Sequence, residues 1–164
     1  MTEEMITKQM PNEVFLPFVV EQLESMEGKT VTLPLRGRSM RPFLEDERDK
    51  ALLIAAKDIH VGDVVLAEII KGHFVLHRII KIDGNHVVLR GDGNMNVEHC
   101  EKKDVKALAL GFYRKNRTKL DSTKGMKWRV YSWIWVRLYP IRRYLLFALH
   151  PHIPQRFKKK IHQL

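Results

Sequence analysis

The chain has 164 residues, which is enough for one domain with a sizeable core. Hydrophobic residues make up 45% of it and charged residues 29%, which is ordinary for a soluble globular protein. A single cysteine, Cys100, excludes an internal disulfide and a cysteine metal cluster, and it fits a reducing compartment.

The net charge of +10 is concentrated in the last third of the chain. Residues 1–110 hold 15 Lys/Arg against 18 Asp/Glu, a net charge of −3. Residues 111–164 hold 14 Lys/Arg against one acid, Asp121, a net charge of +13. Such a block indicates a surface that contacts the phosphates of lipid or nucleic acid, and a solvated basic tail is the alternative.

No targeting or membrane-spanning segment is expected. The first ten residues, MTEEMITKQM, lack the basic start and apolar run of a signal peptide. The longest uncharged stretch, 144–155, has 12 residues, whereas a membrane span needs roughly 18 or more. We therefore expect a cytoplasmic protein, with peripheral contact at the inner membrane face as an option.

The first expected elements are one helix and six strands. Asn12 can cap a helix over 12–27, and Gly28 can end it. From Thr30 the chain becomes rich in Val, Ile and Leu, in short runs separated by Gly and Asp turns. The expected strands are 30–36, 50–56, 63–70, 74–82, 85–90 and 105–114. This pattern predicts a compact, mainly antiparallel β domain.

A candidate nucleophile lies between the first two expected strands, in LRGRSMRP, residues 35–42. Ser39 follows Gly37 by two positions and precedes Pro42 by three. A serine hydroxyl attacks at neutral pH only when it has a neighbouring base and a group that stabilises the oxyanion. A turn with Pro42 in the first turn of a helix would have the same sequence. Both interpretations therefore stay open at this point.

A candidate base lies in the hairpin GHFVLHRIIKIDGNHVVLRGDGN, residues 72–94. The loop is expected to be either residues 83–84 or residues 84–85. Because strands alternate with period two, both registers place His77 and Asp92 on one face, whereas a three-residue loop would separate them. A carboxylate beside imidazole fixes its tautomer and stabilises the imidazolium. His73 has the same parity and is a competing base, and a plain surface histidine is the other interpretation.

The opposite face of this hairpin is expected to face the core. It carries Leu76, Ile80, Ile82, Val87 and Leu89, with Arg78 as the exception. The face with His77 also carries Lys81 and Arg90, so we expect it to be partly wet.

The basic last third contains a polar linker followed by a helical pattern over 124–149. Trp128, Tyr131 and Trp135 fall on one side of that helix, with Arg129 and Arg137 largely opposite. Pro140 should end or restart the helix. Tryptophan interleaved with arginine suits the interface of an anionic membrane, which we predict as a peripheral contact through residues 124–149. The competing outcome is that Trp128, Trp133 and Trp135 are buried against the β domain.

Together these segments resemble the S24/S26 peptidases, the group of the signal peptidases and LexA-like proteins. The resemblance covers residues 30 to about 114 in the family's order. Its motifs are the nucleophile box GRSMRP, the strand VGDVVL (61–66), the base box LHRII (76–80), the later box RGDGN (90–94) and the closing strand KKDVKALALGFYR (102–114).

The resemblance makes Ser39 the nucleophile and His77 the general base, as in the histidine-base members of the group. Asp92 matches the later glycine-aspartate box, and Glu98 stands where those members have their triad acid. We rank Asp92 slightly above Glu98, because Asp92 shares the face of His77 in both two-residue registers. Arg38 replaces the glycine that often directly precedes the serine in signal peptidases. Gly37 stands where some of them carry a hydroxyl that helps the oxyanion hole, so the oxyanion hole is expected to use backbone N–H groups, including that of Ser39. The membrane anchor typical of signal peptidases is not expected here.

The sequence therefore predicts a mainly β, S24/S26-like β-ribbon domain over residues 30–115. A short N-terminal helical leader (1–29) and a basic, aromatic helical extension (116–164) flank it. The predicted function is a serine endopeptidase of Ser-His-acid type, which cuts a peptide or precursor protein such as a leader or signal-like sequence. The alternative is a catalytically inactive member of the fold that binds peptide or membrane. Nucleic acid is not favoured because no reading motif is present, and no cofactor or metal is expected.

Overall fold

A computed structural model describes residues 12–25, 28–115 and 117–149 of the chain. The fold is mainly β, as predicted, with eight strands and three α-helices over these residues. In chain order the elements are α1 (Asn12–Glu24), β1 (Thr30–Pro34), β2 (Lys50–Ala55), β3 (Val64–Ile70), β4 (His73–Asp83), β5 (His86–Arg90), β6 (Glu98–Glu101), a 3₁₀ turn (Lys102–Asp104), β7 (Val105–Tyr113), β8 (Leu120–Ser122), α2 (Met126–Arg137) and α3 (Tyr139–Leu149).

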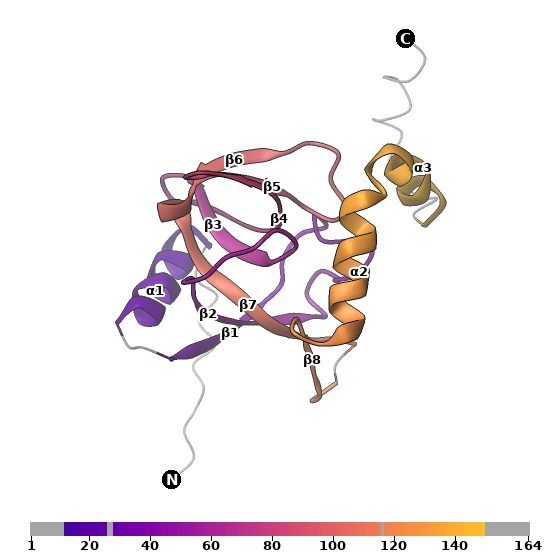
Figure 1. Cartoon of the computed structure of the whole chain (residues 1–164). Helices are drawn as coiled ribbons and strands as arrows, with labels where there is room; N and C mark the ends of the chain where they lie inside the picture. The colour runs from indigo at the N-terminus through magenta and orange to yellow at the C-terminus, as the bar shows by residue number, and fades with distance from the viewer. Residues whose placement is uncertain (1–11, 26–27, 116, 150–164) are drawn as a thin grey trace.

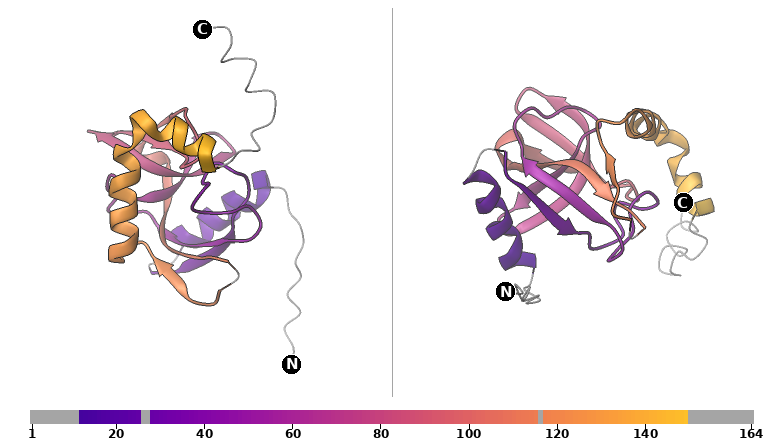
Figure 2. Two further views of the ribbon diagram at one scale, coloured as in Figure 1. Left: turned by 90° about the vertical axis from the view of Figure 1, so that its right-hand side faces the viewer. Right: turned by 90° about the horizontal axis from the view of Figure 1, so that it is seen from below.

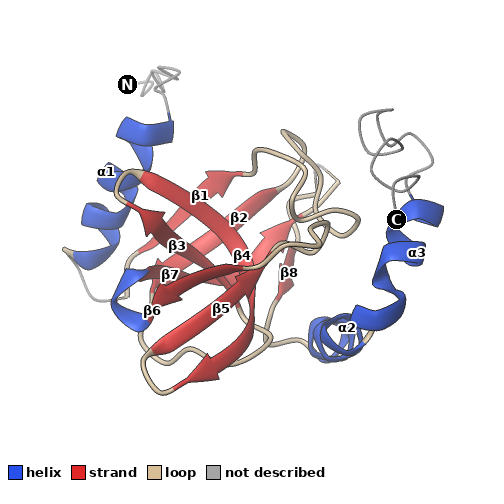
Figure 3. Ribbon diagram, turned by 90° about the horizontal axis from the view of Figure 1, so that it is seen from above, coloured by secondary structure: helices blue, strands red, loops and turns tan. Residues whose placement is uncertain are grey.

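The strands form one antiparallel sheet in the order β1-β2-β7-β3-β4-β5-β6, and β8 pairs with β7. The sheet curls on itself, with α1 on one side of the molecule and α2 and α3 on the other (Figures 1 and 3). The six predicted strands are all present, each within two residues of its expected ends. The strands β6 and β8 were not predicted, because EHCE and LDS are short, polar and without an alternating pattern.

Two hydrophobic cores lie on opposite faces of the sheet, and β3 contributes to both. Val64 and Leu66 point into the first core, whereas Val65 and Ala67 point into the second. This alternation follows from the two-residue period of a strand. All four side chains are buried, so β3 is a central strand covered on both faces.

The flanking helices pack on the first core. On α1, Leu16, Val19, Val20 and Leu23 are buried in it, and the helix ends at Glu24 rather than at the expected position 27. On α2, Trp128 is buried in the same core and lies 4.9 Å from the ring of Phe112, centroid to centroid. The N-terminal and C-terminal segments therefore help to close the core of the β domain.

The C-terminal extension is split into α2 and α3 near Pro140, as predicted. Pro140 is the second residue of α3, where its missing N–H costs no helical hydrogen bond. Figure 2 shows the two helices as an L on one side of the molecule. Within the described part of the chain, every helix is too short or too polar to cross a membrane.

Candidate active site

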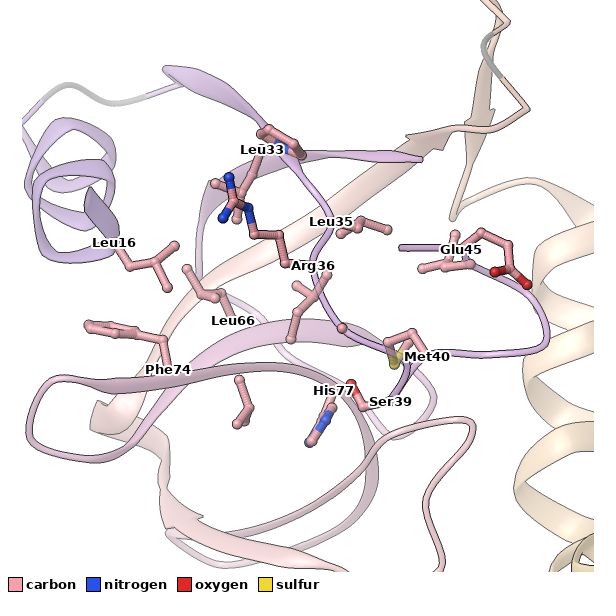
Figure 4. Close-up of a pocket in the computed structure, with 15 residues that line it drawn as sticks. Leu16, Leu33, Leu35, Arg36, Ser39, Met40, Glu45, Leu66, Phe74 and His77 are labelled. Atoms are coloured by element: carbon pink, nitrogen blue, oxygen red, sulfur yellow. The ribbon is translucent and has the colours of Figure 1, made fainter. Parts of the chain in front are cut away.

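A pocket of about 160 Å³ opens between α1, the loop from β1 to β2, and the β3–β4 hairpin. Ser39 and His77 both line this pocket (Figure 4). Most of the other lining is apolar and comes from Leu16, Leu33, Leu35, Met40, Leu44, Leu66, Phe74, Val75 and Leu76. The fold thus brings the predicted nucleophile and the predicted base to one apolar cavity, although 38 residues separate them in sequence.

Ser39 lies in the loop of residues 35–49, which contains turns but no helix, so Pro42 does not begin one. The carbonyl oxygen of Ser39 accepts a hydrogen bond from the N–H of Gly93 at 2.7 Å. On the other side of the serine, the N–H of Gly37 donates to the Asp46 carboxylate at 2.8 Å. The serine is therefore anchored to the later glycine-aspartate box through its own backbone.

A buried carboxylate, Asp49, closes the end of this loop. It accepts two hydrogen bonds from the Arg48 guanidinium, at 2.8 and 2.9 Å, and one each from the N–H groups of Glu45 and Lys115. Burial opposes the charge on Asp49, but these donors outweigh it and lower the pKa of the carboxyl group. No motif in the sequence marks Asp49, whose role appears only once the loop is folded.

His77 is held by Glu98. The Nδ1 atom of His77 lies 2.8 Å from a carboxylate oxygen of Glu98, and the His77 side chain is only 5% exposed. Burial lowers the pKa of His77 because it disfavours the imidazolium, while the charge and hydrogen bond of Glu98 oppose this shift. A neutral imidazole that donates Nδ1–H to Glu98 leaves Nε2 as a proton acceptor.

Gly91 brings the histidine and the serine loop close together. A Cβ atom at this position would lie 2.5 Å from the carbonyl oxygen of Ser39 and 3.0 Å from Nε2 of His77. Only glycine leaves room for this approach. The described hydrogen bonds do not include one between Ser39 Oγ and His77, so the two side chains are neighbours in the pocket rather than a bonded pair.

The expectation that Asp92 shares a face with His77 is wrong, and a β-bulge is the reason. The hairpin loop is residues 84–85, one of the two expected loops, because Asp83 pairs with His86. Between Ile79 and Lys81, however, the register shifts by one residue. A shift of one residue moves every later side chain to the other face.

Asp92 instead pairs with Arg78, the residue that seemed misplaced in a core face. Two hydrogen bonds of 2.8 and 2.7 Å join the guanidinium to the carboxylate, and both side chains are 1% exposed. The ranking of Asp92 above Glu98 as the partner of His77 is thereby reversed. The face that carries His77 is also drier than expected. His77 is buried, and the register shift places Leu89, which we expected on the opposite face, on this face opposite Ile79, while Arg90 lies opposite Arg78 on the other face.

The C-terminal helices cover the Arg78–Asp92 pair. On α2, Ser132 accepts a hydrogen bond from Arg78, and the Tyr131 hydroxyl donates to the Asp92 carboxylate at 3.3 Å. The indole N–H of Trp135 donates to the Asp92 carbonyl at 3.2 Å. On α3, the guanidinium of Arg142 donates to the carbonyl of Gly91 at 2.7 Å. The extension therefore holds the loop that touches Ser39, which the sequence did not indicate.

The remaining candidates lie apart from the pocket. His73, the competing base, is exposed at the start of β4 and does not line the cavity. Within the described ranges, no group of three or more His, Cys, Asp or Glu residues could hold a metal ion. Burial raises the pKa of the Cys100 thiol to about 11, so this cysteine is not activated.

No protein-family model and no curated protein matches the sequence. The functional interpretation therefore depends on the geometry of the pocket and on the motifs of the chain.

Proposed function

We propose that the protein is a serine endopeptidase with Ser39 as the nucleophile, His77 as the general base and Glu98 as the acid. The domain would then be an S24/S26-like peptidase of the histidine-base type. The observation that carries this proposal is the contact between His77 Nδ1 and the Glu98 carboxylate, made by a histidine that lines the same pocket as Ser39. This arrangement supports a triad because the imidazole of His77 has a carboxylate beside it, and the serine hydroxyl has that imidazole as a possible base in the same pocket.

In this reaction the Ser39 hydroxyl oxygen attacks the carbonyl carbon of the scissile peptide bond. The Nε2 atom of His77 takes the hydroxyl proton and later gives it to the leaving amine. Glu98 stabilises the imidazolium that forms between these two transfers. The lowered pKa of His77 supports this role, since it keeps the imidazole neutral and ready to accept a proton near neutral pH.

Backbone N–H groups of the serine loop would donate hydrogen bonds to the oxyanion and so stabilise its negative charge. The Ser39 N–H is a candidate donor to the oxyanion, because the described hydrogen bonds include none in which it is the donor. A preorganised donor of this kind lowers the barrier substantially, and the removal of one typically costs 10²–10³ in kcat. The anchoring of the Ser39 carbonyl by Gly93 would keep this N–H in place.

The pocket suits an extended peptide with an apolar side chain near the cut. Among the described strands, β1 pairs only with β2, so its other edge is available to a substrate strand. Leu33, Pro34 and Leu35 belong to this edge or directly follow it, and they line the cavity. An unfolded leader or a signal-like segment of a precursor protein has the extended, apolar character that such a site accepts.

Labelling with a fluorophosphonate probe tests the proposal, because the oxygen of an activated serine attacks the phosphorus atom of this reagent and displaces fluoride, which leaves a phosphonylated serine. We expect one adduct per chain by intact-protein mass spectrometry, mapped to Ser39 and absent from Ser39→Ala. His77→Ala should label far more slowly. A folded wild-type protein that stays unlabelled would instead favour the alternative, a catalytically inactive member of the fold that binds peptide.

A second step identifies the substrate. Ser39→Ala keeps the pocket but removes the nucleophile, so it should retain uncleaved precursor during purification from its own cells. The retained protein should be cut when purified wild-type enzyme is added, and it should stay intact with fresh Ser39→Ala.

A further inference from the structure

The helix α2 has two apolar faces, and only one of them is covered. Trp128 and Trp135 lie on the inner face and are buried against the β domain. On the outer face, Met126, Val130 and Trp133 are 77%, 49% and 59% exposed. Their spacing of four and then three residues places them in one stripe along the helix. A surface helix normally shows polar residues on this side, so the exposed stripe calls for an explanation.

The helix α3 repeats this arrangement. Arg142 is buried on its inner face, whereas Ile141, Tyr144 and Phe147 are 49%, 64% and 58% exposed at intervals of three residues. Both helices lie on the side of the molecule that faces the reader in the left view of Figure 2. We call these six exposed side chains the outer face: Met126, Val130, Trp133, Ile141, Tyr144 and Phe147.

The charged residues around the outer face are all basic. Exposed Lys127, Arg129, Arg137 and Arg143 lie on the same two helices, and no acidic residue follows Asp121 in the sequence. The Arg137 guanidinium lies 4.3 Å from the ring centroid of Trp133, and that of Arg143 lies 5.1 Å from that of Tyr144. Apolar and aromatic side chains at the centre with cations around them match the headgroup layer of an anionic bilayer.

We propose that the outer face of α2 and α3 docks on an anionic lipid bilayer, with the helices lying in the headgroup layer. A second copy of the chain fits less well, because a two-fold contact would bring one basic rim against the other. Nucleic acid would satisfy the cations but not the aliphatic stripe of Met126, Val130 and Ile141. Docking requires neither Ser39 nor His77, so it stands or falls independently of peptidase activity.

Flotation of the full-length protein with vesicles measures this docking. One set of vesicles contains phosphatidylglycerol and phosphatidylcholine, and the other contains phosphatidylcholine alone. We expect binding to the first set, weakening as salt is added, and much less to the second. Replacing Arg129, Arg137 and Arg143 by Gln should reduce partitioning about fivefold per residue, or on the order of 100-fold together. The matched control replaces exposed lysines elsewhere: Lys50, Lys71 and Lys81.

A second pair of variants tests the apolar stripe. Trp133→Ser with Phe147→Ser should abolish binding, whereas Phe18→Ser with Ile70→Ser should not, although those two side chains are equally exposed. In case a variant is unstable, Trp133 also gives a direct signal in the intact protein. Its fluorescence should be quenched by brominated phosphatidylglycerol vesicles, and Trp133→Phe should lose this quenching because Trp128 and Trp135 are buried.

Three results would overturn the proposal. The first is equal binding to both sets of vesicles or to neither. The second is a concentration-dependent dimer, seen by analytical ultracentrifugation without lipid, that Trp133→Ser abolishes. The third is binding to single-stranded or double-stranded nucleic acid that competes with the vesicles and is insensitive to Trp133→Ser.

Discussion

His77 and Arg78 are neighbours on β4, and each binds one carboxylate, but the two pairs lie in different environments. In the first pair, His77 is 5% exposed and Glu98 is 26% exposed, and His77 lines the pocket. In the second pair, Arg78 and Asp92 are each 1% exposed and are sealed under α2. A pair at a cavity can exchange a proton with a substrate, whereas a sealed pair of fixed charges can only hold parts of the fold together. The alternation of a strand thus places a pair at the pocket and a fully buried pair side by side.

The largest expected effect comes from breaking the first pair. Glu98→Gln replaces the acceptor of the His77 Nδ1–H by an amide, which favours the wrong tautomer. The rate at which a fluorophosphonate labels Ser39 should fall by up to about 10⁴-fold. The free energy of unfolding in urea should change by no more than about 1 kcal/mol, because Glu98 is partly exposed. Glu101→Gln, on the same strand, is the control and should match the wild type in both assays.

Breaking the second pair should affect the fold before it affects the chemistry. Asp92→Asn leaves the Arg78 charge buried without its counterion, which costs about 3–5 kcal/mol of the free energy of unfolding. The double variant Arg78→Met with Asp92→Leu should recover much of that loss, since no charge is left buried. Urea denaturation measures both. A stable Asp92→Asn protein whose Ser39 reacts about 10⁴-fold more slowly with the fluorophosphonate would return the role of triad acid to Asp92.

Gly91 lies between the two pairs, and a side chain there should disturb the first of them. A Cβ atom would overlap the Ser39 carbonyl and crowd His77, so Gly91→Ala must move the serine loop. Displacement of about 1 Å costs on the order of 100-fold in rate, which the fluorophosphonate labelling assay would detect. Gly72→Ala is the control: it adds a methyl group to a positive-φ turn with open space around it. It should lower stability without slowing the labelling of Ser39, and an equal slowing in both variants would refute the steric explanation.

The smallest expected effect is a shift in pH dependence. Because burial lowers the pKa of His77, the labelling of Ser39 by the fluorophosphonate should lose half its rate only below pH 6.5, the ordinary pKa of histidine. Glu98 opposes this lowering, so Glu98→Gln should move the midpoint further down. Stability should also fall as the pH drops below 6.5, because the unfolded chain then binds a proton that buried His77 resists. A midpoint in the wild type above 6.5 would show that Glu98 outweighs burial.

The features that could be predicted from the sequence are those that residues close together in the chain control. The six predicted strands alternate or run apolar between turn residues, and the loop at Gly84-Asn85 is one of the two expected loops. The period of α2 also separated Trp128 and Trp135 from Arg129 and Arg137, and the first two are buried while the last two are exposed. In each case the pattern and the packing are set by residues close in sequence.

The identity of the acid beside His77 could not be predicted in this way. It depends on a bulge at Ile80, which no local pattern in the hairpin marks, and on β6, a polar strand that forms by pairing with β5. The burial of all three tryptophans against the domain, which was the competing outcome to a membrane contact, is likewise confirmed only in part. Trp128 and Trp135 pack on the domain, whereas Trp133 lies on the outer face of α2 and is exposed.

The central claim, that Ser39 cuts peptide bonds with the help of His77 and Glu98, is tested most directly by peptide-bond cleavage itself. Wild-type protein, Ser39→Ala and Glu98→Gln would each be incubated with a library of unfolded peptides, and the new amino termini would be mapped by mass spectrometry. We predict cuts by the wild type beside apolar or small side chains, none by Ser39→Ala, and cuts at the same positions by Glu98→Gln at a greatly reduced rate. Cleavage by Ser39→Ala at the wild-type sites and rate, or no cleavage by a wild type that is folded and fluorophosphonate-reactive, would contradict the account.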